Sequence, residues 1–281
     1  MATAFKWLGM TLGAVLLLAV LAVGVIYGAS EYQLRRYADV PAVAIAVPAG
    51  AAAIAQGRHI AVTRGCFGCH GRDLDGKVFF EDRWMGRLVA ANLTLKVQRY
   101  TNAQVARILR YGVRPDGTAV IGMPSATFHF LDDQDLGNLI AFLRSVPKAD
   151  HPLPATHLRI MGRLEILRHP WRIAAHEIRG LGPPMHPGMP AATAAYGDYL
   201  AHTVCTECHG PDLDGEGGFT PNLTIAKAYS LTDFTRLMRS GMALGGRDPG
   251  LMGEVARSRF SHFDDKEIAA IYAYLQTRHS P

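Results

Sequence analysis

The chain has 281 residues, enough for one large domain or two small domains with connecting segments. Its 29 Lys and Arg against 24 Asp and Glu give a net charge of +5, which is too mild to indicate a nucleic-acid partner. The charge is uneven, because residues 50–147 carry 12 basic and 8 acidic side chains whereas residues 196–281 carry 8 and 11. We expect the two regions, with their opposite signs, to face different protein partners.

An uncharged stretch of 21 residues runs from Trp7 to Tyr27. As a helix it would be about 31 Å long, the thickness of a bilayer's hydrocarbon core, and aromatic rings at both ends are typical of membrane interfaces. A cleaved signal peptide is the alternative, since Gly28–Ser30 offers small residues, although its apolar part normally spans only about 7–15 residues. We predict a retained membrane anchor over residues 1–30 and a linker over residues 31–49.

All four cysteines of the chain fall into two copies of one pattern, C-x-x-C-H, at residues 66–70 and 205–209. This pattern is the signature for attachment of c-type haem. Two cysteines on one helical turn can each form a thioether to a haem vinyl group, and the adjacent His can bind the iron. The residues that carry the two copies are Cys66, Cys69, His70, Cys205, Cys208 and His209.

Three other uses of paired cysteines compete with haem attachment. A thioredoxin-like redox pair needs a βαβ pattern nearby, and no strands are predicted around either motif. A zinc site is awkward because a His that directly follows the cysteines does not close a tetrahedron easily. Structural disulfides would not require a His after each pair. We therefore predict two covalently bound haem c groups.

The second half of the chain repeats the motifs of the first half. The repeat predicts one domain over residues 50–147 and another over residues 193–281. The first copy differs from the second by an insertion around Phe79–Met85. Phe80 and Trp84 of this insertion either shield a haem edge or pack the insertion against the rest of the domain. The matching pieces are His70–Gly76 with His209–Gly215, Asn92–Thr94 with Asn222–Thr224, Arg110–Gly112 with Arg239–Gly241, and Leu131–Val146 with Phe263–Arg278.

Both copies are predicted to be helical. The terminal segments have apolar residues at a spacing of three to four, and Asp264 with Glu267 resembles a capping box, of which Asp132 with Asp135 is a weaker version. The Pro-rich linker over residues 148–192 contains a basic helical stretch, which lies either on the membrane surface or between the two domains. The other predicted helices are Ala51–Arg64, Asn102–Arg110, His157–Arg168, Thr193–Val204 and Asp233–Arg239.

Two C-x-x-C-H sites, each with a Met-bearing loop and an amphipathic terminal helix after it, resemble tandem class I cytochrome c domains. With the anchor, the C-x-x-C-H-G-x-D-L-x-G run and the Asn-Leu-Thr piece, the chain is similar to bacterial diheme c-type cytochromes, including cytochrome subunits of membrane-bound dehydrogenases. The resemblance implies an all-α fold with an N-terminal transmembrane helix and two cytochrome c domains. It also implies export before haem attachment, and hence haem domains in the periplasm at the bacterial inner membrane.

An electron-carrying haem needs a second axial ligand, and a Met thioether raises its reduction potential. In the first copy Met123, which precedes Pro124 and the last helix, is predicted to be this ligand, with Met85 as the alternative. In the second copy we predict Met252, because it lies as far past Gly241 as Met123 lies past Gly112. The alternatives there are Met242 or an open iron. His129, His186 and His262 are expected at the surface or in loops.

The most direct function is electron transfer between a dehydrogenase or quinol-oxidising complex and a soluble cytochrome, another carrier or a terminal oxidase. The chain is then a carrier or an electron-transfer subunit and not an enzyme by itself. The second interpretation is a diheme enzyme, such as a peroxidase or a small-sulfur-compound oxidoreductase, in which one haem is open to substrate. A haem-based sensor is the third.

Overall fold

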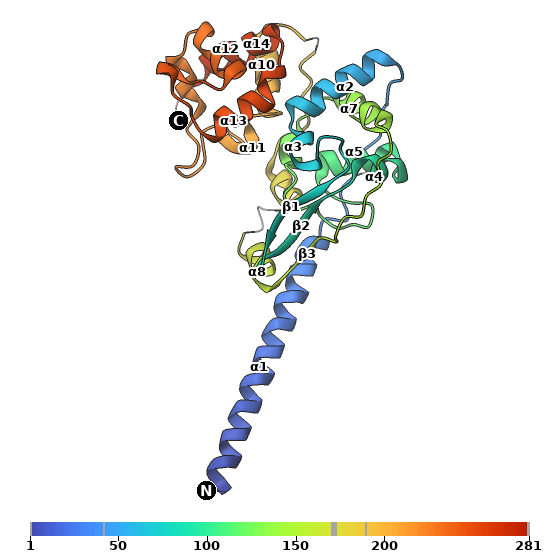
Figure 1. The fold of residues 1–281 in the computed structure, drawn as a ribbon, viewed down its shortest axis with the longest axis vertical. Coiled ribbons are helices and arrows are strands. Elements are labelled where there is room, and N and C mark those ends of the chain that lie inside the picture. Colours follow the sequence, from blue (N-terminus) through green and yellow to red (C-terminus); the bar gives the residue numbers. More distant parts are fainter. Residues whose placement is uncertain (1, 42, 170–172, 189, 280–281) are drawn as a thin grey trace.

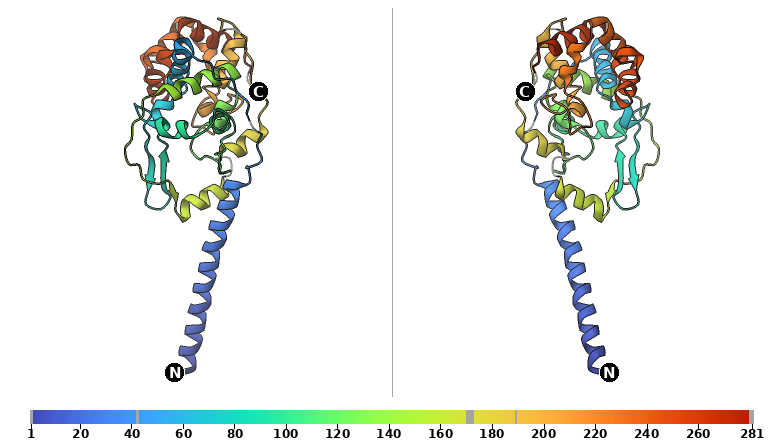
Figure 2. Two further views of the ribbon diagram at one scale, coloured as in Figure 1. Left: turned by 90° about the vertical axis from the view of Figure 1, so that its right-hand side faces the viewer. Right: turned by 90° about the vertical axis from the view of Figure 1, so that its left-hand side faces the viewer.

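The computed structural model describes residues 2–41, 43–169, 173–188 and 190–279. A single long helix, α1 (Ala2–Arg35), projects from a mostly helical body, so the all-α prediction is confirmed (Figure 1). Phe5–Arg35 is long and apolar enough to cross a membrane, since its most apolar stretch of 18 residues has a mean hydropathy of 2.5, and it includes the uncharged stretch Trp7–Tyr27. The views in Figure 2 show that the body gathers at one end of α1, with the C-terminal helices (red) at the end of the body away from the N-terminus.

The helices of the body form two sets joined by a connecting segment. The first set is α2 (Ala51–Thr63), α3 (Cys66–His70), α4 (Leu93–Arg99), α5 (Asn102–Tyr111), α6 (Ser125–His129) and α7 (Asp133–Ser145). The connecting segment holds α8 (Ile160–Arg168), α9 (Ala174–Glu177) and the 3-10 turn η2 (Ile178–Gly180). The second set is α10 (Ala194–His202), α11 (Thr206–His209), η3 (Leu223–Ala228), α12 (Leu231–Ser240), η4 (Leu244–Gly246), α13 (Leu251–Ser258), η5 (Phe260–His262) and α14 (Asp265–Thr277).

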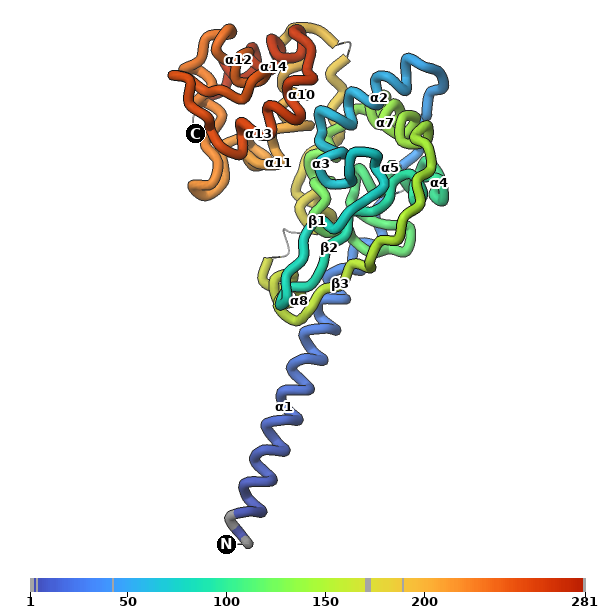
Figure 3. Tube along the Cα trace, in the orientation of Figure 1, coloured from blue at the N-terminus to red at the C-terminus, as the bar shows by residue number. Residues whose placement is uncertain are grey.

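In each set the first helix crosses the last helix at a buried glycine. Gly57 of α2 lies directly against the backbone carbonyl of Asn138 in α7, and Gly197 of α10 lies against that of Ala270 in α14. A Cβ atom at either glycine would overlap the carbonyl oxygen. These two crossings carry α2 beside α7 and α10 beside α14, as the trace in Figure 3 shows.

Equivalent arginines tie the middle of each set to the start of its terminal helix. Arg110 donates to Leu131 O at 2.7 Å and to Asp133 Oδ1 at 2.6 Å. Arg239 donates in the same way to the carbonyl of Phe263 and to Asp265 Oδ1, the latter at 2.7 Å. The repeat seen in the sequence is therefore also a repeat of contacts. The predicted Asp264 capping box with Glu267 is present.

The insertion in the first copy is a β-hairpin, so the expectation that no strands flank the haem motifs is wrong there. Strand β1 (Lys77–Asp82) pairs with β2 (Gly86–Ala90), and β2 also pairs with the short β3 (His157–Leu158). β1 is mostly exposed and contains Lys, Glu and Asp, so it lacks the alternation that marks a half-buried strand. β3 also replaces the start of the helix predicted from His157, which begins at Ile160 instead.

The end of α1 belongs to the body and not to a free linker. The helix continues to Arg35, whose side chain pairs with Glu31 at 2.6 Å. Ser30 and Tyr37 are fully buried, and Tyr37 lies in a small core with residues of the connecting segment. The backbone N–H of Ala119 also donates to Leu34 O at 2.8 Å. The junction between α1 and the first set of helices is thus a packed interface.

The basic helix α8 packs against this end of α1. Arg163 of α8 donates to Ser30 Oγ at 2.9 Å, and its guanidinium lies 4.3 Å from the centroid of the Tyr27 ring. Because Tyr27 ends the uncharged stretch, α8 lies at the level where α1 leaves the apolar segment. α8 therefore does not lie between the two haem domains, which was the other position predicted for this basic stretch.

Candidate haem sites

The first C-x-x-C-H motif forms the short helix α3, bounded by glycines that allow sharp turns of the backbone. Gly65 before the helix and Gly71 after it both have positive φ angles, 77° and 86°. This conformation is costly for residues with a Cβ atom. The one-turn helix brings both cysteines and the adjacent His to one cavity.

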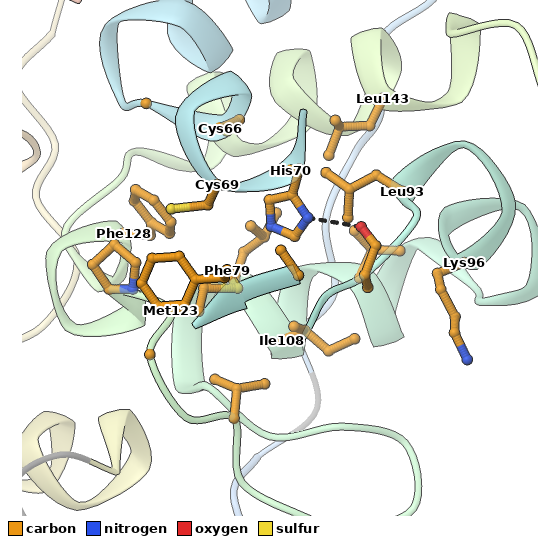
Figure 4. Close-up of a pocket in the computed structure, with 18 of the residues that line it drawn as sticks. Cys66, Cys69, His70, Phe79, Leu93, Lys96, Ile108, Met123, Phe128 and Leu143 are labelled. Atoms are coloured by element: carbon orange, nitrogen blue, oxygen red, sulfur yellow. Dashed lines mark hydrogen bonds between the residues drawn. The ribbon is translucent and has the colours of Figure 1, made fainter. Parts of the chain in front are cut away.

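A cavity of about 300 Å³ lies beside α3, lined by Cys66, Cys69, His70 and Met123 (Figure 4). Its other walls are largely apolar, and include Leu93, Val97, Ile108, Leu109, Val120, Phe128 and Leu143. Two thiols, an imidazole and a thioether around an apolar space are the donor set that a covalently bound haem requires. The residues present therefore fit the group.

The alternative ligand Met85 does not line this cavity. It lies next to the hairpin turn, where its N–H donates to Asp82 Oδ1 at 2.8 Å and its carbonyl accepts from Arg159 N at 3.0 Å. Of the aromatic residues in the insertion, Phe79 reaches the cavity wall, whereas Phe80 and Trp84 are 38% and 60% exposed. The structure thus brings Met123, and not Met85, to the first haem motif.

Both motif histidines are held by the same backbone contact. His70 Nδ1 lies 2.8 Å from Ala91 O, and His209 Nδ1 lies 2.8 Å from Pro221 O. If Nδ1 carries the proton that this contact requires, Nε2 is left with its lone pair for iron. Burial also lowers the pKa of both imidazoles, which favours the neutral form that binds a metal.

This contact explains the repeated Asn-Leu-Thr piece, whose role the sequence reasoning missed. Each accepting carbonyl belongs to the residue directly before the Asn, and each Asn caps the next helical element. The Asn92 side chain accepts from Leu95 N at 3.3 Å and donates to Ala149 O at 2.6 Å. The piece therefore fixes the carbonyl that contacts Nδ1 of the motif His.

The thiols differ from those of a redox-active pair. Burial raises the pKa of Cys66 to about 12 and that of Cys205 to about 12. A redox-active cysteine needs a depressed pKa so that the thiolate forms near neutral pH. The environment of the cysteines therefore disfavours the thioredoxin-like alternative.

In the second set, His209 ends α11 and Met252 is the second residue of α13. Met252 is half-buried and packs against the main hydrophobic core. Helix α13 is the counterpart of α6, since each packs on the preceding helix of its set. The helices α6 and α13 both end six residues after their Met, so the three extra residues of the second copy lie between α13 and Asp264, where η5 is found. Met242 is also half-buried and directly follows Gly241, which ends α12.

His129 is not at the surface, contrary to expectation. It is 5% exposed, and its Nδ1 and Nε2 lie 3.0 Å from Arg110 O and 2.8 Å from Gly182 O. The side chain joins α6 to the connecting segment, a partner that local sequence could not indicate. His186 and His262 are exposed, as predicted.

Comparison with known proteins agrees with this geometry. The cytochrome c family profile matches residues 54–147 and 194–279, so the chain belongs to the cytochrome c family. It is 27% identical over 258 residues to the fructose dehydrogenase cytochrome subunit of Gluconobacter japonicus, covering 80% of this chain and 52% of that protein. It is also 27% identical over 204 residues to a diheme cytochrome c-type protein of Cereibacter sphaeroides, covering 63% of this chain and 65% of that one.

The chain thus spans between about half and two thirds of the length of these relatives. Two cytochrome c domains with two attachment motifs carry two covalently bound haem c groups, as predicted. The protein transfers electrons by haem.

Proposed function

We propose that this protein is a membrane-anchored electron-transfer subunit that takes single electrons from a dehydrogenase or quinol-oxidising complex. It passes them to a soluble carrier or a terminal oxidase. The observation that carries the proposal is the combination, in one chain, of two haem motifs with the long apolar helix α1. The likeness to a protein named as the cytochrome subunit of a dehydrogenase supports a dehydrogenase as the donor.

Each haem would be held by two thioethers and two axial ligands. When bound, the group supplies reversible one-electron chemistry at its iron. The chain contributes oriented imidazoles, thioether sulfurs that favour the reduced iron, and apolar walls that exclude water. The proposed ligands are Cys66, Cys69, His70 and Met123 for the first haem, and Cys205, Cys208, His209 and Met252 for the second.

Helix α1 would act as a retained anchor and not as a cleaved signal. It runs without a break through the small residues Gly28–Ser30, and the buried Ser30 Oγ accepts a hydrogen bond from Arg163. Cleavage there would remove the Tyr27 ring and this contact. The basic helix α8 would then lie on the lipid headgroups, where arginines are favourable.

The haem domains would lie in the periplasm of a bacterial inner membrane. This orientation rests on the resemblance, which implies export before the haems are attached. The uncharged stretch is flanked by Lys6 on one side and by Arg35 and Arg36 on the other, so the positive-inside rule does not decide it.

Gentle detergent extraction of membranes that contain the tagged full-length protein tests this function. We expect a dehydrogenase or quinol-oxidising complex to purify with it, and the substrate of that complex to reduce both haems. Carbon monoxide should leave the reduced spectrum unchanged, because both irons keep two axial ligands. Carbon monoxide binding to one haem with turnover of a small substrate would instead support the diheme enzyme.

A further inference from the structure

Arg259 of the second set links the two haem motifs. It follows the C-terminus of α13, and its side chain is only 18% exposed. Its Nη1 donates to Glu207 Oε2 at 2.7 Å, and Glu207 lies inside the second motif, between Cys205 and Cys208. One end of the contact is therefore fixed within the attachment site of the second haem.

The same guanidinium reaches the first motif. It packs against Gly65, directly before Cys66, and a Cβ atom at position 65 would overlap the guanidinium carbon. Arg259 and Glu207 both line the cavity of the first haem site, together with Cys66 and Cys69. The ion pair thus belongs to the walls of the first site although both of its residues come from the second set.

Two further contacts hold the motifs together around this pair. Arg64, 4% exposed, donates to Thr63 Oγ1 at 2.8 Å and across the interface to Thr203 Oγ1 at 3.1 Å. Thr206 of the second motif donates to Thr127 Oγ1 of α6 at 3.1 Å. α3, α6 and α11 therefore meet in one place.

We propose that Arg259 is a positioning residue shared by the two haem sites. It holds the attachment motifs against each other and neutralises Glu207 between them, so that electrons pass between the haems across this contact. In that step one iron is oxidised from ferrous to ferric as the other is reduced from ferric to ferrous, and no bond or proton moves. The proposal rests on the two bound haems and not on the identity of any partner.

The charges define the expected effects. Replacing Arg259 with Met leaves the Glu207 carboxylate unpaired in a partly buried place, which disfavours the added electron. Replacing Glu207 with Gln leaves the positive charge unpaired, which favours it. The double variant Arg259→Met/Glu207→Gln carries neither charge, so its potentials should return toward the wild type while the contact stays broken.

The test is a redox titration of the purified full-length protein with both haems bound, in detergent and without any partner. Arg259→Met should lower the midpoint potential of at least one haem by about 59 mV. For a one-electron couple this shift corresponds to a tenfold change in the ratio of oxidised to reduced haem. Glu207→Gln should shift the same midpoint upward. Arg236→Met is the matched control, because it removes an exposed arginine that pairs with Asp233 at 2.7 Å within one helix.

Electron transfer between the haems after flash reduction is the second readout. Both Arg259→Met and the double variant should slow it about tenfold, and Arg259→Lys, which keeps the charge, should retain wild-type potentials. If Arg259→Met does not fold, Glu207→Gln and Arg259→Lys still decide the question. Shifts equal to those of the Arg236 control, or an unchanged interhaem rate in the double variant, would overturn the proposal.

Discussion

The histidines of the two C-x-x-C-H motifs show what single residues can and cannot indicate. The sequence singles out His70 and His209 because the C-x-x-C-H pattern places a potential iron ligand beside the two attachment cysteines. The carbonyls of Ala91 and Pro221 that contact them could not be predicted, because a backbone acceptor has no residue type of its own. The role of Arg259 could not be predicted for a different reason, because its contact with Gly65 joins positions far apart in the sequence.

The proposed axial ligand of the second haem, Met252, can be tested by a single substitution. Replacing Met252 with Ala should remove the sulfur-to-iron charge-transfer band of one haem and lower its midpoint potential, because the thioether favours ferrous iron. The vacated position should also let carbon monoxide bind. Absorption spectra and a redox titration of the full-length protein measure these changes.

Met242 is the matched control for this substitution. It is half-buried like Met252, but it directly follows the C-cap Gly241 of α12. Met252 instead lies at the start of α13, as its second residue, and Met123 lies two residues before α6. The Met242→Ala protein should keep both charge-transfer bands. Loss of a band in Met242→Ala with a normal spectrum for Met252→Ala would show that the alignment of the two copies is wrong.

At the scale of elements, the amphipathic helices and their caps could be predicted because periodicity and capping residues are local. The hairpin of β1 and β2 could not, because its first strand is exposed and its partner β3 lies beyond α7 in the chain. The sequence does not determine the place of α8, since a basic helix can face lipid or protein. Its contacts with Tyr27 and Ser30 come from the tertiary fold.

The crossing of α2 and α7 should be intolerant of a methyl group. In a helix interior, an alanine is more favourable than a glycine by about 1 kcal/mol of folding free energy. At Gly57, however, the added Cβ would overlap the Asn138 carbonyl, so we expect a net loss of about 2 kcal/mol in the free energy of unfolding. Denaturant titration of the haem-loaded protein measures it.

Gly180 supplies the comparison, because a Cβ atom there would meet nothing within 4 Å. The Gly180→Ala protein should unfold at the same denaturant concentration as the wild type or slightly above it. Equal stability of the two variants would mean that α2 and α7 do not cross at Gly57.

Removal of the apolar part of α1 tests whether this helix is the proposed anchor. A chain without residues 1–30, exported by a cleavable signal, should be soluble and keep both haems. Tyr37, whose buried ring packs with the connecting segment, remains in that chain. Fractionation after cell lysis and the haem spectrum of the soluble fraction measure the outcome.

Binding of the shortened chain to lipid would point to α8 as a second attachment. High salt should then release it, because the contact would depend on arginines at the headgroups. If the shortened chain stayed bound to membranes at high salt, the apolar part of α1 would not be needed for membrane binding. The contact of α8 with lipid would then not be purely electrostatic.

For the whole molecule, the charge is graded along the axis set by α1. The region closest to α1 is basic, with 12 basic and 8 acidic residues over 50–147, and the connecting segment adds six basic and three acidic residues. The second haem domain, farther from the N-terminus of α1, has 8 basic and 11 acidic residues (Figure 1). The propionates of each haem add further negative charge, which leaves the second domain acidic and reduces the excess of the first.

This gradient predicts which carriers dock where. A basic soluble carrier should be attracted to the acidic second domain, so its electron-transfer rate should fall as ionic strength rises. An acidic carrier that exchanges electrons there would be repelled, and its rate should rise with salt. If an acidic carrier instead loses rate with salt, the basic first domain is its docking face. Stopped-flow rates with one carrier of each sign, measured over a range of salt concentrations, separate these cases, and rates that do not respond to salt for either carrier would remove electrostatics from the choice of partner.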